Sequence, residues 1–161
     1  FVRSQAVVPF VIAVMVIGFL DGFDGVLARI TNRVTKFGGY LDAVCDRYVE
    51  SIVVFTVAYV TGYWLLSMIV ITGAMMVSYC KARTAMEVPI SNLEWPDFME
   101  RAERSVIYGV GLLAGDLLPM TIRGRNLFWW TLVTLAVLTH LTAFQRIFRA
   151  RNIIKERSGQ G

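Results

Sequence analysis

The sequence predicts an all-α protein, a polytopic transmembrane bundle of about five helices. Hydrophobic residues make up 56% of the 161 residues and charged residues only 17%, a more apolar balance than that of ordinary soluble domains. No charged residue occurs between Glu50 and Lys81, a run of 30 positions. As a single helix this run would measure about 45 Å, which exceeds the roughly 30 Å hydrocarbon core of one bilayer. The run must therefore turn, and it contains two spans.

Five apolar segments account for the expected helices, taken in chain order. The charge-free run divides at Gly62, because a helix-ending glycine beside Tyr63 and Trp64 is typical of a hairpin tip at a membrane surface. Reading the rest of the chain in the same way adds one span before this pair and two after it. The expected spans are Val7–Ala28, Gly38–Gly62, Trp64–Met86, Arg104–Leu118 and Leu127–Phe148.

The basic residues fix the expected orientation of these spans. If the helices alternate in direction, 13 of the 16 basic residues fall on one side of the membrane and 3 on the other. This is the positive-inside pattern, so the helix ends near Arg29, Lys81 and Arg146 should be cytoplasmic. The three on the other side are Arg3, Arg123 and Arg125. The sequence pI near 9.3 is then explained by topology and anionic lipid headgroups, and no nucleic-acid partner is expected.

A single transmembrane domain is expected over residues 1–155, followed by a short tail at 156–161. The chain begins almost at a span and without an initiator Met, which suggests a missing upstream segment. Cys45 and Cys80 lack metal-type spacing and lie near the expected cytoplasmic ends of their helices. The cytoplasm is a reducing compartment, so no structural disulfide is expected. His140, alone on an apolar helix, is expected to serve packing or a helix hydrogen bond.

Four aspartates occur where an ionisable group is costly, in or beside the first two spans. Asp21 and Asp24 are spaced i,i+3, and Asp42 and Asp46 are spaced i,i+4, so each pair shares one helix face. An acid at the centre of a membrane helix costs about 2.5 to 3.5 kcal/mol on insertion scales. The short polar connection 30–37 makes the two helices an antiparallel hairpin, which brings the pairs face to face. Unless several are protonated, these acids need cations, and all-oxygen ligation suits Mg²⁺ or Mn²⁺ better than zinc.

Small residues surround these acids and leave one helix face nearly bare. Gly18, Gly22, Gly25 and Ala28 recur at i+3 or i+4. Close packing of a second helix explains such a stripe as well as close approach of a ligand does. Arg29 is either a topology marker or a contact for an anionic ligand.

The acids and small residues together form one long motif. Written out, it reads Asp21-x2-Asp24-Gly25-x2-Ala28-Arg29-x8-Gly38-x3-Asp42-x3-Asp46. This pattern resembles the full signature of the CDP-alcohol phosphotransferase family, and every position of the signature is matched. The resemblance implies a six-helix transmembrane fold, usually dimeric, that moves a phospho-alcohol group from a CDP-alcohol to a second alcohol and releases CMP. Since five spans are evident in this chain, the first helix of the family would lie upstream of it.

The resemblance also implies roles for individual residues. The four aspartates would hold one or two divalent metals, Mg²⁺ or Mn²⁺, against the diphosphate. Asp46 would act as general base on the acceptor hydroxyl, with a role as plain ligand left open. The residues implied to bind the CDP-alcohol are Asp21, Gly22, Gly25, Ala28, Arg29, Gly38 and Asp42.

A second set of residues concerns the acceptor. Basic side chains at the expected cytoplasmic ends of the last three spans are either snorkelling anchors or a pocket for a phosphate group. The segments 79–83 and 99–104 resemble those of the phosphatidylinositol-phosphate and archaetidylinositol-phosphate synthase branch, whose acceptor is inositol 1-phosphate. By this resemblance a phosphorylated polyol is expected to bind Lys81, Arg83, Arg101, Arg104 and Arg146.

Other functions stay open at this point. The same chemistry could use glycerol 3-phosphate, serine or another polar alcohol as acceptor. Intramembrane acids also mark cation and proton transporters, and an assembly protein without activity could share the fold. Clustering of the acids with Arg29 towards the cytoplasmic end favours a nucleotide site over a transport pathway. The expected protein is thus a multi-pass enzyme of the cell membrane whose active site faces the cytoplasm.

Overall fold

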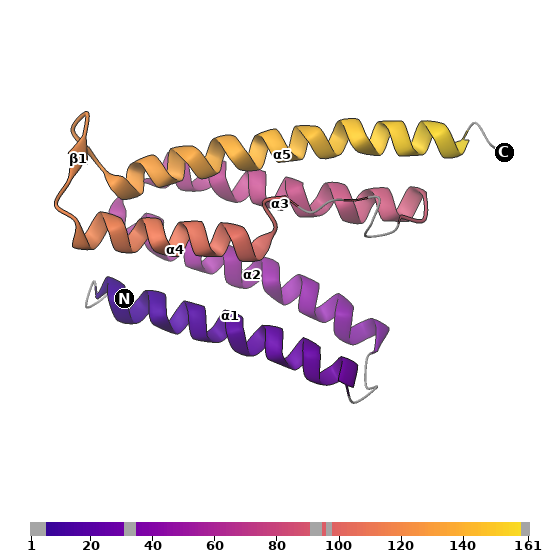
Figure 1. Cartoon of the computed structure of the whole chain (residues 1–161), viewed down its shortest axis with the longest axis horizontal. Coiled ribbons are helices and arrows are strands. Elements are labelled where there is room, and N and C mark those ends of the chain that lie inside the picture. Colours follow the sequence, from indigo (N-terminus) through magenta and orange to yellow (C-terminus); the bar gives the residue numbers. More distant parts are fainter. Residues whose placement is uncertain (1–5, 31–34, 91–94, 96–97, 159–161) are drawn as a thin grey trace. The chain divides into compact units, whose positions relative to one another are not determined.

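A computed structural model describes residues 6–30, 35–90, 95 and 98–158, with the backbone alone at residues 19, 21–29 and 158. The regular secondary structure of the described residues is helical apart from one short hairpin (Figure 1). The elements in order are α1 (Val7–Ile30), α2 (Lys36–Thr61), α3 (Trp64–Glu87), α4 (Arg101–Leu117), β1 (Thr121–Ile122), β2 (Arg125–Asn126) and α5 (Leu127–Ser158). The prediction of an all-α bundle of five helices is confirmed.

The chain divides into two compact units, Phe1–Trp64 and Leu65–Gly161, and each is described by itself. The first unit contains α1 and α2. Gly62 ends α2 in the left-handed region (φ 74°), and its N–H donates to the carbonyl oxygen of Ala58 at 2.8 Å. Glycine adopts this conformation without the penalty that a Cβ brings. The predicted helix end at Gly62 is therefore confirmed.

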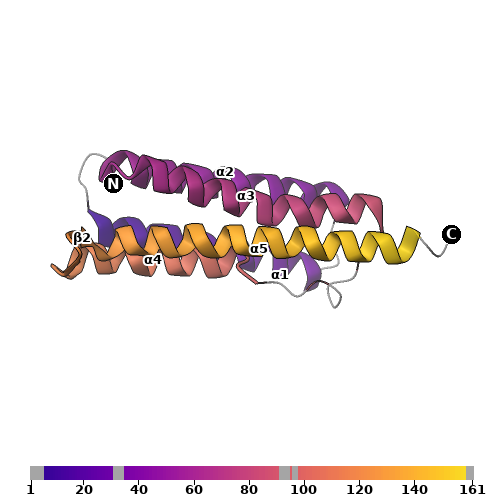
Figure 2. The same ribbon diagram turned by 90° about the horizontal axis from the view of Figure 1, so that it is seen from above.

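In the second unit, α5 packs against both α3 and α4. Figures 1 and 2 show α4 and α5 side by side, and these two helices share the most extensive contact among the described elements. Glycines allow the close approach. A Cβ on Gly111 of α4 would lie 2.3 Å from Cγ2 of Thr131, and a Cβ on Gly73 of α3 would lie 2.3 Å from Oγ1 of Thr139. Helices this close bury apolar side chains between them, including Leu132 of α5.

The predicted spans agree with the observed helices to within a few residues, except at the end of the chain. The last span was expected to end at Phe148, but α5 continues to Ser158 and enters the segment expected as a tail. Its 32 residues measure about 48 Å, longer than one hydrocarbon core. Among the described residues, α3 and the Leu127–Arg157 part of α5 are long and apolar enough to cross a membrane, and Val7–Gly18 is a shorter apolar segment.

Candidate active site

The first half of the aspartate signature lies on α1. Asp21, Asp24 and Arg29 all fall within this helix, whose backbone is continuous to Ile30. Residues three apart lie on the same face of a helix, so the two aspartates share a face as expected. Their side chains, and those of Gly22, Gly25 and Ala28, lie outside the described residues. At Gly18, one turn earlier, an added Cβ would meet nothing within 4 Å.

The second half of the signature lies at the start of α2. Thr35 caps this helix in an extended conformation, and its Oγ1 accepts a hydrogen bond from the N–H of Gly38 at 2.9 Å. A Cβ on Gly38 would lie 2.8 Å from the same oxygen, so the cap itself favours glycine at this position. The helix therefore begins just ahead of Asp42 and Asp46, which are one turn apart on one face.

The two aspartates of α2 differ in their surroundings. Asp42 is exposed, whereas the side chain of Asp46 is only 19% exposed and its Oδ2 lies 3.9 Å from Nη2 of Arg47. Arg47 also pairs through Nη1 with Oε2 of Glu50, at 3.1 Å. Glu50 is two turns beyond Asp42 on the same side of α2, and sequence reasoning missed it although its i,i+4 spacing from Asp46 was a signal. Arg47 thus places positive charge beside the half-buried carboxylate of Asp46.

The donor chemistry of the signature fits a hard divalent cation. Asp42 and Asp46 offer carboxylate oxygens from adjacent turns, and such oxygens are the ligands that Mg²⁺ and Mn²⁺ take. Within the described side chains, no three acidic, histidine or cysteine residues come together as a metal site. The convergence of all four aspartates therefore stays a prediction, because half of the set falls on undescribed side chains of α1.

The expected acceptor residues Lys81 and Arg83 lie in the last two turns of α3 and form ion pairs. Lys81 Nζ lies 3.7 Å from Oε1 of Glu100, just before α4, and Arg83 Nη2 lies 2.5 Å from Oε1 of Glu87. Arg83 and Glu87 are about half exposed, so their pair contributes little stability. Lys81 is less exposed and connects the end of α3 to the start of α4.

Arg104 is buried at the start of α4. Only 4% of it is exposed, and its Nη1 donates to the carbonyl oxygen of Met99 at 2.5 Å. Met99 itself is buried in a left-handed conformation (φ 55°), rare for a residue with a side chain. The Glu103 carboxylate accepts a hydrogen bond from the N–H of Glu100 at 3.0 Å. These bonds fix the turn that leads into α4, where Arg101 is the first helical residue.

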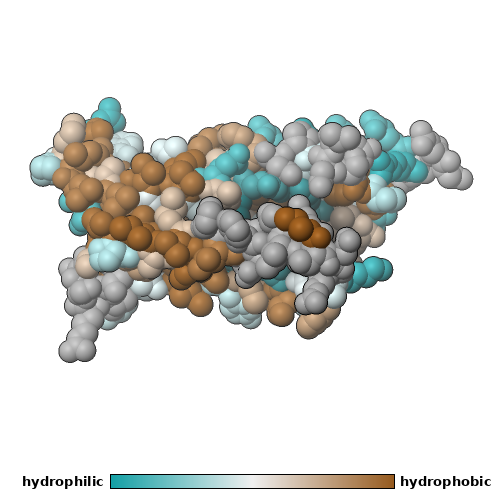
Figure 3. All heavy atoms as spheres, turned by 60° about the horizontal axis from the view of Figure 1, so that its bottom comes forward, coloured by the Kyte–Doolittle hydropathy of each residue, from teal (hydrophilic) through white to brown (hydrophobic). Residues whose placement is uncertain are grey.

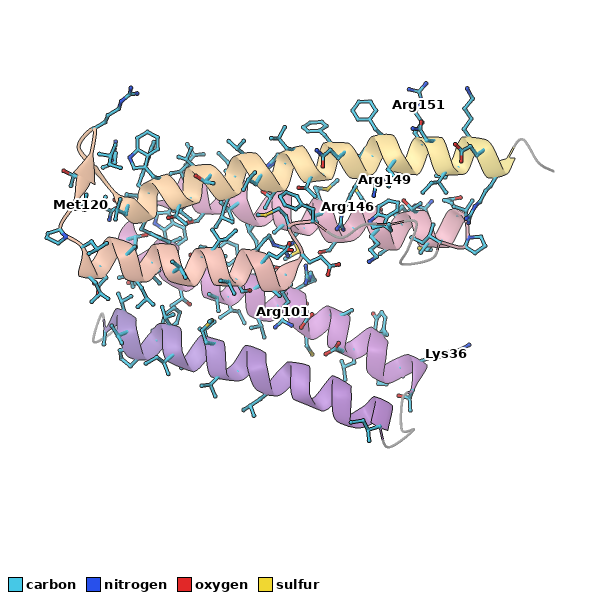
Figure 4. The ribbon with its side chains drawn as sticks, viewed as in Figure 1. Lys36, Arg101, Met120, Arg146, Arg149 and Arg151 are labelled. Carbon is cyan, nitrogen blue, oxygen red and sulfur yellow. The ribbon has the colours of Figure 1, made fainter. Side chains whose placement is uncertain are left out.

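Arg146 is buried between α3 and α5. It is 5% exposed, and its Nη1 donates to the carbonyl oxygen of Val77 at 2.7 Å. Its guanidinium carbon lies 5.9 Å from the ring centroid of Trp95, which has no exposed surface. Figure 4 shows Arg146 on the side of α5 that faces α3 and Arg151 on the opposite side. Sequence reasoning missed Trp95, although a tryptophan inside a polar connection was a signal.

Smaller expectations are confirmed. Cys45 and Cys80 are free thiols. Nδ1 of His140 lies 3.0 Å from the carbonyl oxygen of Ala136, one turn back along α5, and the ring lies against Gly73 of α3. The histidine therefore serves packing and a helix hydrogen bond, as the sequence indicated.

The chain is similar to one family of known proteins and to several individual proteins. A family model described as CDP-alcohol phosphatidyltransferase matches residues 1–139. Archaetidylinositol phosphate synthase of Pyrococcus horikoshii is 30% identical over 153 residues, which are 94% of this chain and 73% of that protein. The protein of the same name from Methanothermobacter thermautotrophicus is 33% identical over 135 residues, which are 81% of this chain and 63% of that protein.

A bacterial relative is similar to the same degree. Phosphatidylinositol phosphate synthase of Mycolicibacterium smegmatis is 32% identical over 143 residues, which are 81% of this chain and 60% of that protein. The chain thus spans between about three fifths and three quarters of the length of these three relatives. The family match and the two apolar helices of spanning length are those of a membrane protein. The chain belongs to the CDP-alcohol phosphatidyltransferase family.

Proposed function

We propose that the chain is the catalytic part of a membrane enzyme of phospholipid biosynthesis that transfers a phospho-alcohol group from a CDP-alcohol to inositol 1-phosphate and releases CMP. The observation that carries this proposal is the complete aspartate signature, divided between α1 and the capped start of α2. The names of the relatives, which are archaetidylinositol and phosphatidylinositol phosphate synthases, support inositol phosphate as acceptor.

The metal set is Asp21, Asp24, Asp42 and Asp46, holding one or two Mg²⁺ or Mn²⁺ ions. The family is generally dependent on a divalent metal, and the all-oxygen donors fit these ions. When bound, such an ion neutralises diphosphate charge and stabilises CMP as a leaving group. Gly22, Gly25, Ala28, Arg29 and Gly38 line the nucleotide, the small residues by letting it lie against the helix backbone.

Asp46 is the general base of the proposed reaction. It removes the proton from the acceptor hydroxyl, whose oxygen then bonds to the β-phosphorus while the bond from that phosphorus to the CMP oxygen breaks. Half-burial of Asp46 limits its contact with water, and Arg47 at 3.9 Å holds positive charge beside it. Because Arg47 also pairs with Glu50, the arginine has a fixed position along α2 and steadies the carboxylate that must accept the proton.

The acceptor phosphate is bound by Lys81, Arg83, Arg101, Arg104 and Arg146. Within the second unit, the ion pair of Lys81 with Glu100 brings the last turns of α3 to the start of α4. Arg104 and Arg146 also support this region, since each donates to a backbone carbonyl. Guanidinium groups suit a phosphate because they present paired donors in a plane.

Exposed apolar side chains support a multi-pass arrangement in the cell membrane. On α5, Val137, Leu141, Phe144 and Phe148 are all more than half exposed and follow one another at helical spacing. In Figure 3 hydrophobic residues cover much of the visible surface, and hydrophilic residues gather towards the C-terminal end of α5. We place that end in the cytoplasm by the positive-inside pattern, and the active site with it. A homodimer is the form that the family resemblance implies.

A transfer assay tests the function. Protein in detergent with Mg²⁺ or Mn²⁺ and a CDP-lipid is offered inositol 1-phosphate, glycerol 3-phosphate, serine or free inositol separately, and CMP is measured. CMP release with inositol 1-phosphate alone, abolished in Asp46→Asn, is the expected result. Asp116→Asn is the matched control, since Asp116 is an exposed acid of α4 outside the signature. Release with another acceptor would discard the acceptor assignment.

A result with no release from any acceptor and no CDP binding would overturn the transferase proposal itself. A cation or proton transporter would then be the reading to test, by ion flux into vesicles containing the protein.

A further inference from the structure

The connection between α4 and α5 is a tight hairpin with an unusual residue at its turn. Thr121 pairs with Asn126 and Ile122 pairs with Arg125 in antiparallel register. The two turn residues, Arg123 and Gly124, both have positive φ, at 52° and 72°, as in the two-residue turns that suit a twisted hairpin. Glycine and asparagine are the residues favoured at the first of these positions, and an arginine there is strained.

The hairpin is bound firmly to the first turn of α5. Nε1 of Trp130 donates to the carbonyl oxygen of Ile122 at 3.0 Å, and Oδ1 of Asn126 accepts from the N–H of Trp129 at 3.0 Å. The two indole rings meet edge to face at 4.8 Å. The Arg125 guanidinium lies 5.6 Å from the centroid of the Trp129 ring. Arg125 therefore lies against a pair of tryptophans at the start of α5, and Arg123 lies in the adjoining turn.

Apolar side chains around this pair of tryptophans are exposed. The fractional exposures are 61% for Leu117, 46% for Leu118, 60% for Met120 and 48% for Ile122. Figure 4 shows Met120 on the segment that leads from α4 into the hairpin. α5 begins directly after the hairpin and is one of the two described helices long and apolar enough to cross a membrane. The hairpin thus lies at the boundary where such a helix enters the bilayer.

The charge of this segment is positive. Asp116 is the one carboxylate in the sequence between Glu103 and Glu156, whereas Arg123 and Arg125 stand within three residues of each other. Tryptophan is enriched at the headgroup level of bilayers. Basic residues near the surface are attracted to anionic headgroups. The combination of exposed apolar residues, tryptophans and arginines therefore matches an anionic lipid surface in both polarity and charge.

We infer that the α4–α5 hairpin is a membrane-interface anchor that binds the headgroup of an anionic phospholipid through Arg123 and Arg125, with Leu118, Met120 and Ile122 inserted among the acyl chains. The inference rests on the placement of α5 across a bilayer in the proposed function. It explains the arginine at the strained turn position, because a cation there has a role that asparagine or glycine would not fill. This lipid contact is separate from the transferase site.

Fluorescence quenching tests the anchor. The whole chain carrying Trp64→Phe, in detergent, is titrated with brominated phosphatidylglycerol and, separately, with brominated phosphatidylcholine. Trp95 has no exposed surface, so quenching reports on Trp129 and Trp130. We expect phosphatidylglycerol to quench at lower concentration, and Arg123→Asn to raise its half-maximal concentration about five-fold, the effect of one basic residue near an anionic surface.

Arg123→Lys is the matched control, since lysine retains the charge and is as strained as arginine in the left-handed region. Its tryptophans should be quenched at the same phosphatidylglycerol concentration as those of the parent protein. Arg123→Asn should also unfold about 2 to 4 °C higher in neutral detergent, because asparagine tolerates the left-handed region. An unchanged phosphatidylglycerol titration in Arg123→Asn, or an equal loss in Arg123→Lys, would overturn the inference. Competition by millimolar inorganic phosphate would indicate a free-anion site and would also overturn it.

The same samples separate this inference from the proposed function. Transfer activity in micelles of neutral detergent should be equal in the parent, Arg123→Asn and Arg123→Lys proteins. Selective quenching without transfer activity would refute the enzyme and leave the anchor intact. Activity without selective quenching would refute the anchor alone.

Discussion

Replacement of Gly111 by alanine should destabilise the second unit, because α4 and α5 touch at this position. The added Cβ would lie 2.3 Å from Cγ2, 2.4 Å from Oγ1 and 2.6 Å from Cβ of Thr131. These atoms belong to a β-branched side chain that cannot move aside by rotating its far end. The helices must therefore separate, and the cost of overpacking is about 1 to 3 kcal/mol. Alanine regains about 0.5 to 1 kcal/mol of helix propensity, which leaves a net loss of about 1 kcal/mol from the middle of the two ranges and about 2.5 kcal/mol at most.

Thermal unfolding in detergent measures this loss. For a chain of this size, a change of about 1 kcal/mol moves the midpoint by about 2 to 4 °C, so Gly111→Ala should unfold lower by about 2 to 4 °C, and by about 10 °C at most. Gly39→Ala is the matched control, since Gly39 lies in a helix and an added Cβ meets nothing within 4 Å. That variant should unfold at the same temperature or higher.

A second substitution tests the cause. All three short contacts come from the side chain of Thr131, so Thr131→Gly combined with Gly111→Ala should recover much of the loss, with a coupling free energy of about 0.5 to 3 kcal/mol. A Gly111→Ala protein as stable as Gly39→Ala, or additive effects in the double variant, would refute close packing of α4 on α5 at this point.

Three further predictions concern the site and the start of α5. Trp95→Ala should raise the KM for inositol 1-phosphate about 2- to 30-fold, the range of a lost cation–π contact with Arg146, and should leave kcat nearly unchanged. In Trp95→Phe the KM should return most of the way to that of the parent protein. Steady-state kinetics checks this, and an equal fall in kcat in both variants would contradict it. Asn126→Ala should lower the unfolding midpoint by about 2 to 4 °C through loss of a helix cap worth about 1 kcal/mol, whereas Asn126→Asp should not, as a thermal scan of the two variants would measure. Chelation by EDTA should abolish CMP release and added Mg²⁺ or Mn²⁺ should restore it; a rate insensitive to EDTA would rule out the metal set.

Local patterns in the sequence were sufficient to predict the helices. The charge-free run and Gly62 placed the turn between α2 and α3 correctly. The left-handed conformation that ends α2 is a local property of the backbone at that position, and it favours glycine. The hairpin at 121–126 was missed. Its signal was the pair Arg123-Gly124, in which only the second residue is the one that such a turn favours. The length of α5 was also underestimated, since hydropathy marks where an apolar segment ends and not where the helix ends.

The two halves of the candidate site differ in how far sequence could predict them. The aspartates follow from spacing within one turn of helix, so the sharing of a face by Asp42 and Asp46 needs only α2 to form. The basic residues depend on tertiary contacts. Arg146 donates to the carbonyl oxygen of Val77, 69 positions earlier in the chain, and no pattern in the sequence indicates that contact.

Buried Arg146 connects α5 to α3, so a substitution at this residue affects the fold as well as the acceptor pocket. A variant that removes this arginine would leave the Val77 contact between α3 and α5 unmade, so a loss of transfer could come from the fold as readily as from phosphate binding. Arg146→Lys keeps the charge and can still reach a carbonyl, but it loses the planar donor pair. A lysine variant that unfolds like the parent yet binds inositol 1-phosphate weakly would therefore assign the guanidinium to the acceptor. Equal losses of stability and binding would assign Arg146 to the packing of α3 on α5, and Lys81 and Arg101 would then be the first residues to test as phosphate ligands.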